Sequence, residues 1–341
     1  MEDAEFIPPQ NRIDSFGHEA LEKRLRQTMA DGALSHGWII SGPSGAGKAT
    51  LAYRLARALL EPQALTSNDS LQMSDMARAF RLIASNAHPD LFVAERIWDA
   101  KKSKYQTDIT VDTIRRLTGF LNRTAAEGGA RVAIIDTADD MNRNAANALL
   151  KVLEEPPQGA VLLLLSASPG RLLPTIRSRC RTIEAPLLEQ SQLFRFLSQE
   201  GVDPSTAEIV SAVAKGRPGY ALQLASSEGV EAINLARSFL KIAVSHGDLS
   251  RIIAGVSGKA GEGRWPIFRD MILTMLSDTA RDAARGNNNN THLSYETPAL
   301  LMAWEGLKAL LIRGEALNLD RGQLLHAMAH DLREALFLRA A

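Results

Sequence analysis

The chain has 341 residues, of which 45% are hydrophobic and 23% are charged. This length exceeds what one small core can organise and predicts two or three domains, and the composition is typical of a soluble globular protein. The formal net charge is zero. No global electrostatic field would therefore recruit nucleic acid, and any contact with DNA would need a local patch or partner proteins.

The first predicted elements surround a glycine-rich loop. Residues 17–31 have apolar side chains at helical spacing, and residues 37–41 have the pattern of a short buried strand. Between this strand and a predicted helix over 50–60 lies Gly42-Pro43-Ser44-Gly45-Ala46-Gly47-Lys48-Ala49. The loop matches the phosphate-loop pattern G-x-x-x-x-G-K-[ST] except at its last position. Its place between a strand and a helix favours a phosphate-binding site.

The loop is predicted to bind the phosphates of a nucleotide and to hold Mg²⁺ weakly if at all. Its backbone N–H groups, the amino end of the next helix and the ammonium of Lys48 would face a polyphosphate. Ala49 replaces the hydroxyl that would coordinate Mg²⁺, and Thr50 points about 100° away on the helix. We therefore expect ATP or ADP as a possible ligand of Gly42–Thr50, with little or no hydrolysis. A glycine-rich turn without a ligand is the alternative.

Strands and helices alternate up to residue 186. A turn that enters a strand is predicted over 88–93, strands are predicted over 131–136 and 160–166, and helices over 73–83, 110–121 and 145–155. This alternation is typical of a parallel sheet covered on both faces. Asp136, at the end of the strand 131–136, stands where phosphate-loop proteins carry the acid that orients Mg²⁺. Thr137 follows it and offers no carboxylate to polarise water. An acid that only caps a loop is the alternative interpretation of Asp136.

After about Pro186 all strong patterns are helical. Helices are predicted over 190–199, 205–214, 220–225, 230–245, 265–284, 298–313 and 320–338. The asparagine-rich tract 286–291 is predicted to be a surface loop. The sequence thus predicts an α/β phosphate-loop domain over 1–186, a helical domain over 187–228 and a second helical domain over 229–341.

Two motifs indicate a family. Residues 147–157 read Asn-Ala-Leu-Leu-Lys-Val-Leu-Glu-Glu-Pro-Pro, and residues 172–180 end in Ser178-Arg179-Cys180. With the segments 16–19 and 88–90 and the loop, they resemble the clamp-loader subunits of bacterial DNA polymerase III, an AAA+ family, strongly over 6–225. The resemblance implies an AAA+ domain, a helical lid (187–228) and a collar (229–341) that holds a ring of subunits together.

The resemblance also implies partners and a role for Arg179. The partners would be gamma/tau and delta subunits, with the sliding clamp and primed DNA bound through the complex. In this family the arginine of Ser-Arg-Cys reaches across a subunit interface to the ATP of the neighbour, so Arg179 would act in trans. Local sequence alone leaves another interpretation open, in which Arg177, Arg179 and Arg181 form a solvated basic strip. Likewise, Lys151 and Glu155 could form a plain intrahelical ion pair.

Departures from the family pattern favour a member other than the ATP-hydrolysing gamma/tau subunit. Gamma/tau-like chains are expected to carry a hydroxyl, a Glu and a lid arginine where this chain has Ala49, Thr137 and Gly219. The four-cysteine zinc module of some members is absent because residues 61–90 contain no cysteine, so no zinc is expected. An active gamma/tau-like ATPase or a nucleotide kinase is the alternative function, and a DNA-binding adaptor is a third.

The cysteine content and the first residues indicate a compartment. Cys180 is the only cysteine of the chain, which excludes an internal disulfide and favours a reducing environment. We expect it to be a packed small apolar residue. The start, Met1–Glu5, is acidic without a hydrophobic targeting core, and no apolar run reaches the roughly 18 residues of a membrane span. We therefore expect a cytoplasmic protein.

Overall fold

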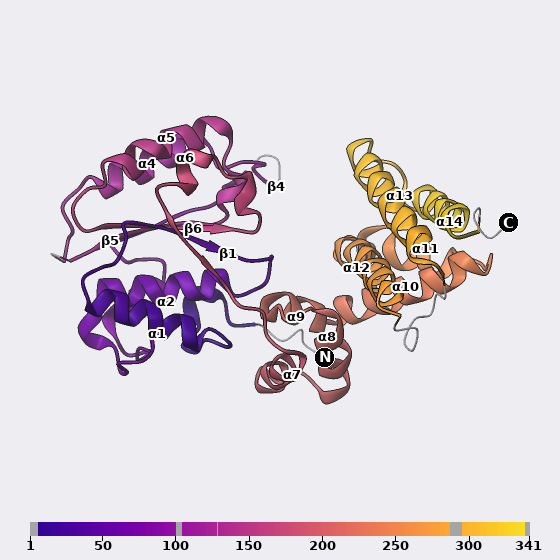
Figure 1. Ribbon diagram of the computed structural model, residues 1–341, viewed down its shortest axis with the longest axis horizontal. Coiled ribbons are helices and arrows are strands. Elements are labelled where there is room, and N and C mark those ends of the chain that lie inside the picture. Colours follow the sequence, from indigo (N-terminus) through magenta and orange to yellow (C-terminus); the bar gives the residue numbers. More distant parts are fainter. Residues whose placement is uncertain (1–5, 100–103, 128, 287–294, 338–341) are drawn as a thin grey trace. The chain divides into compact units, whose positions relative to one another are not determined.

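The computed structural model describes residues 6–99, 104–127, 129–286 and 295–337. They fall into two compact units, one up to residue 222 and the other from residue 223 onward (Figure 1). Within the described ranges, every helix is too short or too polar to span a lipid bilayer. The acidic start Met1–Glu5, residues 287–291 of the predicted surface loop and the predicted helix end at Leu338 lie outside the described residues.

The first unit is built around a five-stranded parallel sheet. In spatial order its strands are β2 (Leu91–Ala94), β5 (Arg131–Ile135), β6 (Ala160–Ser166), β1 (Gly37–Ser41) and β7 (Arg181–Glu184). All four pairings are parallel, so the carboxyl ends of the strands meet at one edge of the sheet. β1, β5 and β6 are buried along their whole length, which explains their unbroken apolar sequences. The predicted α/β fold class is confirmed.

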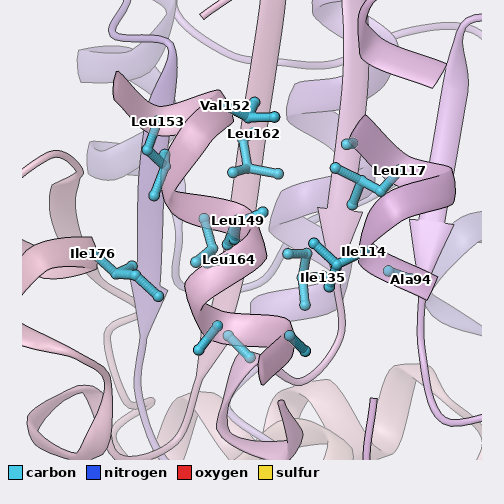
Figure 2. Close-up of a cluster of buried hydrophobic side chains, with 14 of the residues drawn as sticks. Ala94, Ile114, Leu117, Ile135, Leu149, Val152, Leu153, Leu162, Leu164 and Ile176 are labelled. Atoms are coloured by element: carbon cyan, nitrogen blue, oxygen red, sulfur yellow. The ribbon is translucent and has the colours of Figure 1, made fainter. Parts of the chain in front are cut away.

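Helices cover both faces of this sheet (Figure 1). One face is covered by α4 (Val111–Leu121), α5 (Arg143–Glu154) and the short α6 (Pro174–Arg177), and the other by α1 (Glu19–Ala30) and α2 (Lys48–Leu60). Because side chains alternate along a strand, Ile39 of β1 points to the first face and Ile40 to the second. Figure 2 shows the first face, where Leu149, Val152 and Leu153 of α5 pack near Leu162 and Leu164 of β6. Each fully buried Leu or Ile of such a cluster contributes about 1.5–3 kcal/mol.

The segment between α2 and β2 differs from the sequence prediction. The helix predicted over 73–83 begins only at Arg78, as α3 (Arg78–Ala84). Met73 instead forms an isolated antiparallel bridge with Leu65 and packs in a small cluster with Ala79 and Phe80. The helical prediction for residues 73–77 was therefore wrong, because the bridge to Leu65, earlier in the same segment, holds Met73 in an extended conformation.

Several short elements were not predicted. They include β7, the antiparallel ribbon of β3 (Trp98–Asp99) and β4 (Lys104–Tyr105), and α6. The described residues also form short 3-10 helices, namely η1 (Pro9–Asn11), η2 (Pro62–Ala64), η3 (Ala138–Asp140), η4 (Pro169–Arg171) and η5 (Lys259–Gly261). Of these elements, η3 and α6 position candidate functional residues.

Three helices follow β7, namely α7 (Gln190–Gln199), α8 (Pro204–Val213) and α9 (Pro218–Ala225). α7 begins with a capping box formed by Glu189 and Gln192, and the side chain of Asp203 caps α8. The N-terminal segment of the chain ties α7 to the sheet domain. The guanidinium of Arg12 donates to both carboxylate oxygens of Glu200, at 2.7 and 3.0 Å.

The second unit is helical. It contains α10 (Ser227–Val244), α11 (Ser250–Val256), α12 (Arg264–Ala284), α13 (Thr297–Ala316) and α14 (Arg321–Phe337). Its core includes Phe239 and Phe268, whose ring centroids lie 5.8 Å apart. Apart from α11, these helices agree with the predicted ones to within a few residues. The predicted division into helical domains over 187–228 and 229–341 stays a prediction.

Candidate functional site

The glycine-rich loop connects the carboxyl end of β1 to the start of α2. Gly42, Gly45 and Gly47 have φ values of +146°, +81° and +86°, which residues with a Cβ rarely adopt. Lys48 opens α2, and its Nζ donates to the carbonyl oxygens of Gly42 and Pro43, at 2.7 and 2.9 Å. The ammonium group therefore closes over the loop at the positively polarised end of a helix.

Asp136 lies at the same edge of the sheet, directly after β5. Burial raises its pKa, while a hydrogen bond from the hydroxyl of Thr137 and the charge of Lys48 lower it. Burial likewise lowers the pKa of Lys48, and the charges of Asp136 and Asp139 oppose that shift. Lys48 and Asp136 are thus close enough for the charge of each to shift the pKa of the other.

The position after Lys48 cannot provide a hydroxyl. Ala49 is partly buried against the core on one face of the sheet, and Thr50 is partly exposed. The loop amides and Lys48 fit a phosphate group, since both are donors at a helix amino end. The residues do not fit a well-held magnesium ion, because Ala49 offers only a methyl group where Mg²⁺ would need an oxygen ligand.

Two contacts that sequence reasoning missed hold the loop. The N–H of Gly219 donates to the carbonyl of Gly45 at 2.8 Å, and a Cβ on Gly45 would lie only 2.5 Å from the backbone nitrogen of Tyr220. In addition, Nε2 of the buried His18 donates to the carbonyl of Ala46 at 3.2 Å. Burial lowers the pKa of His18, which favours the neutral ring. The motif at residues 16–19 was a usable signal for His18, whereas nothing in the sequence marks Tyr220.

Asp139 is a further residue that sequence reasoning did not single out. Its carboxylate accepts hydrogen bonds from the hydroxyl of Ser166 (2.9 Å) and from the amides of Ala167 (2.6 Å) and Ser168 (3.3 Å). It therefore fastens η3, which follows Asp136, to the carboxyl end of β6. Three acidic residues stand close together in the sequence here, and only the structure distinguishes this one.

Arg179 lies at the end of the sheet where β1 begins, opposite the end that carries the loop. It precedes β7, whose first residue Arg181 pairs with Trp38 near the amino end of β1. Cys180 packs against the core, and a Cβ on Gly37 would lie 3.1 Å from its Sγ. Burial raises the pKa of Cys180 to about 11, so its thiol is protonated at neutral pH and acts as a small packed group, as expected.

The length of β1 separates Arg179 from the loop of its own chain. The strand rises by about 3.3 Å per residue, so roughly 20 Å separate the level of Arg179 from Gly42. An arginine side chain cannot cover that distance. If Arg179 acts on a phosphate, the phosphate therefore belongs to another molecule.

The guanidinium of Arg179 is held by residues on two helices. Its NH2 group contacts Oε1 of Glu154 at 2.9 Å, and NH1 donates to the carbonyl of Thr175 at 3.0 Å. The side chains of Arg179 and Glu154 are 35% and 50% exposed. Arg179 thus has defined partners, whereas the side chain of Arg177 is exposed, and a solvated basic strip stays the alternative interpretation of these arginines.

The parallel sheet, the phosphate loop after β1, the acid after β5 and the helices after β7 define an AAA+ protein of the P-loop class. A family model described as DNA polymerase III, delta subunit, matches residues 17–189. The DNA polymerase III subunit delta' of Escherichia coli K12 is 33% identical over 259 residues, which cover 74% of this chain and 73% of the relative. The chain belongs to the delta prime family of bacterial DNA polymerase III.

Other relatives match over shorter stretches. The delta' subunit of Pseudomonas aeruginosa PAO1 is 38% identical over 192 residues, so the chain spans about half the length of that relative, 56%. The tau subunit of Escherichia coli K12 is 28% identical over 227 residues, which cover 63% of this chain and 32% of tau. The resemblance found in the motifs thus extends over between about half and three quarters of the chain.

Proposed function

We propose that this chain is the delta prime subunit of a cytoplasmic clamp loader and helps to load the sliding clamp onto primed DNA. In this proposal it assembles with gamma/tau and delta subunits and donates Arg179 in trans to the ATP site of a neighbouring gamma/tau subunit. The chain itself hydrolyses little or no ATP. Its helices over 187–228 act as the lid and those over 229–341 as the collar.

The observation that carries the proposal is the place of Arg179. The guanidinium is partly exposed at the edge of the sheet farthest from the loop of its own chain, and it is presented by a segment that Cys180 anchors in the core. A planar, permanently charged guanidinium can bind two phosphate oxygens at once, which an ammonium cannot do. An arginine supplied in trans accelerates phosphoryl transfer by about 10³–10⁵ where this has been measured.

The loop of this chain keeps part of a nucleotide site. In the loop 42–49, backbone N–H groups after Pro43 and the ammonium of Lys48 would hold the phosphates of ATP or ADP, with Thr50 and Asp136 nearby. Bound Mg²⁺ would be weakly held because Ala49 supplies no hydroxyl, and Thr137 cannot activate a water molecule. These departures argue against the alternatives of an active gamma/tau-like ATPase or a nucleotide kinase.

The test is a reconstituted complex with gamma/tau and delta subunits from the same organism. Arg179→Ala should assemble normally, as checked by size-exclusion chromatography, and should lower both clamp loading and the ATPase activity stimulated by DNA and clamp. Arg179→Lys should rescue poorly. Arg177→Ala is the matched control, because that exposed arginine stands two residues away and should be neutral. Unchanged clamp loading by the assembled Arg179→Ala complex would contradict the proposal.

A further inference from the structure

We infer that Glu154 is a positioning residue for Arg179: its carboxylate fixes the guanidinium in the orientation in which the group meets a phosphate of the neighbouring subunit. The inference rests on the function proposed above for Arg179. It adds a second member to the site, from a different helix.

Both backbone positions that carry the pair are anchored in the core. α5 ends at Glu154 because Pro156 and Pro157 follow and cannot continue the helix. Leu153, just before Glu154, and Ile176 of α6 are buried in the same hydrophobic cluster, and Figure 2 shows them at one end of it. Cys180, just after Arg179, packs against that cluster too. Core packing therefore sets the positions of Glu154 and Arg179 relative to each other, and their side chains meet.

The contacts leave part of the guanidinium available. This group presents five N–H donors in one plane. Glu154 takes a donor of NH2, while NH1 faces the carbonyl of Thr175 and, at 3.4 Å, the hydroxyl of Ser178. In the described part of the chain, Nε of Arg179 has no acceptor. Acceptors on two sides fix the plane of the guanidinium, and the remaining donors can bind phosphate oxygens.

Water screens an exposed ion pair, so Glu154 acts on Arg179 by orienting its guanidinium. Such a pair changes an equilibrium by up to about fivefold. The negative charge of Glu154 also opposes an approaching phosphate, so charge and orientation act in opposite directions. Glu154→Gln separates them, because glutamine keeps an acceptor oxygen at the same reach without the charge. Glu154→Ala removes both.

The first experiment uses the isolated full chain. The rate at which phenylglyoxal modifies Arg179 is measured by peptide mass spectrometry in wild type, Glu154→Ala and the control Glu155→Ala. We expect Glu154→Ala to raise the rate about two- to fivefold and Glu155→Ala to leave it unchanged. Equal rates in all three proteins would overturn the inference.

The second experiment uses the reconstituted complex. Glu154→Ala should lower clamp loading about three- to fivefold. Glu154→Gln should retain most of the wild-type clamp loading. In an Arg179→Ala background, Glu154→Ala should have no further effect. If Arg179→Ala itself has no effect, the proposed function fails and the inference fails with it. If Arg179→Ala lowers loading but Glu154→Ala does not, or if the two losses multiply in the double variant, the inference alone fails.

Discussion

Neutralising Glu22 should destabilise the region that supports the phosphate loop. Glu22 on α1 accepts hydrogen bonds from Nε and NH2 of Arg54 on α2, at 2.6 and 2.8 Å, and from the amide of Leu71 at 3.1 Å. The side chains of Arg54 and Glu22 are only 4% and 2% exposed. Glu22→Gln leaves the charge of Arg54 buried without a counter-charge. We expect this change to lower the free energy of unfolding of the first unit by about 3–5 kcal/mol.

The loss should depend on pH. Burial raises the pKa of Glu22, but the hydrogen bonds and charge of Arg54, with the amide of Leu71, outweigh burial and bring the pKa below its usual value of 4.5. A carboxyl group whose pKa is lower in the folded state stabilises the protein above its unfolded pKa and loses this effect as the pH falls through the folded pKa. At pH 7 the free energy of unfolding of Glu22→Gln should therefore lie below that of wild type by the full amount. This gap should become smaller below about pH 4.

Hydrogen exchange measured by mass spectrometry in rising urea gives the assay, because peptides from α1 and α2 report on the first unit and peptides from α12 on the second. Lys23→Gln is the matched control. Lys23 neighbours Glu22 and forms an ion pair with Asp69 in which the side chains are 65% and 70% exposed. Its loss should cost less than about 1 kcal/mol. A loss below about 1 kcal/mol for Glu22→Gln, or one equally large at pH 3 and pH 7, would refute this account of the buried pair.

Two further predictions concern the loop. The isolated chain should show negligible ATPase activity, because Ala49 and Thr137 lack the hydroxyl and the carboxylate of an active site; turnover of about 1 s⁻¹ or faster by the purified protein would contradict this. Gly45→Ala should destabilise the first unit by about 2–3 kcal/mol in urea unfolding, since φ is +81° and the new Cβ would meet the backbone nitrogen of Tyr220. Gly32→Ala, at a φ of +64° with nothing within 4 Å, measures the backbone strain alone, and an equal loss in both variants would show that Tyr220 does not press on the loop.

The buried parts of the sheet could be predicted from the sequence because their patterns are local. β5 and β6 lie inside the sheet and are apolar along their whole length, so each appears as an uninterrupted run between turns. β7 lies at the edge and buries only Ile183, which leaves a four-residue pattern too weak to detect. Met73 shows a different limit, because its bridge to Leu65 depends on pairing that no periodicity reveals.

The same distinction separates the predicted site residues from the missed ones. The glycines, Lys48 and Arg179 belong to compact motifs, so type and spacing were enough to find them. Helical spacing drew attention to Lys151 and Glu155, but α5 ends at Glu154, and among the described residues the carboxylate that forms an ion pair at this end of the helix is that of Glu154. Its partner comes from the segment after α6, which only tertiary packing brings beside α5. His18 and Tyr220 likewise reach the loop from segments far apart in the chain.

β1 places the two candidate sites at opposite ends of one strand. Its carboxyl end leads into Gly42, and Gly37 at its amino end lies so close to Cys180 and Leu153 that a Cβ would be 3.1 Å from a side-chain atom of each. A larger residue at Gly37 would therefore press on the segment that carries Arg179 without touching the loop. A phosphate loop at one end of the sheet and an arginine at the opposite end face different neighbours. A subunit in which both sites contact other subunits therefore needs two of them. Such head-to-tail contacts generate rings when the rotation closes, and this geometry supports the proposal that the chain works within a ring of related subunits.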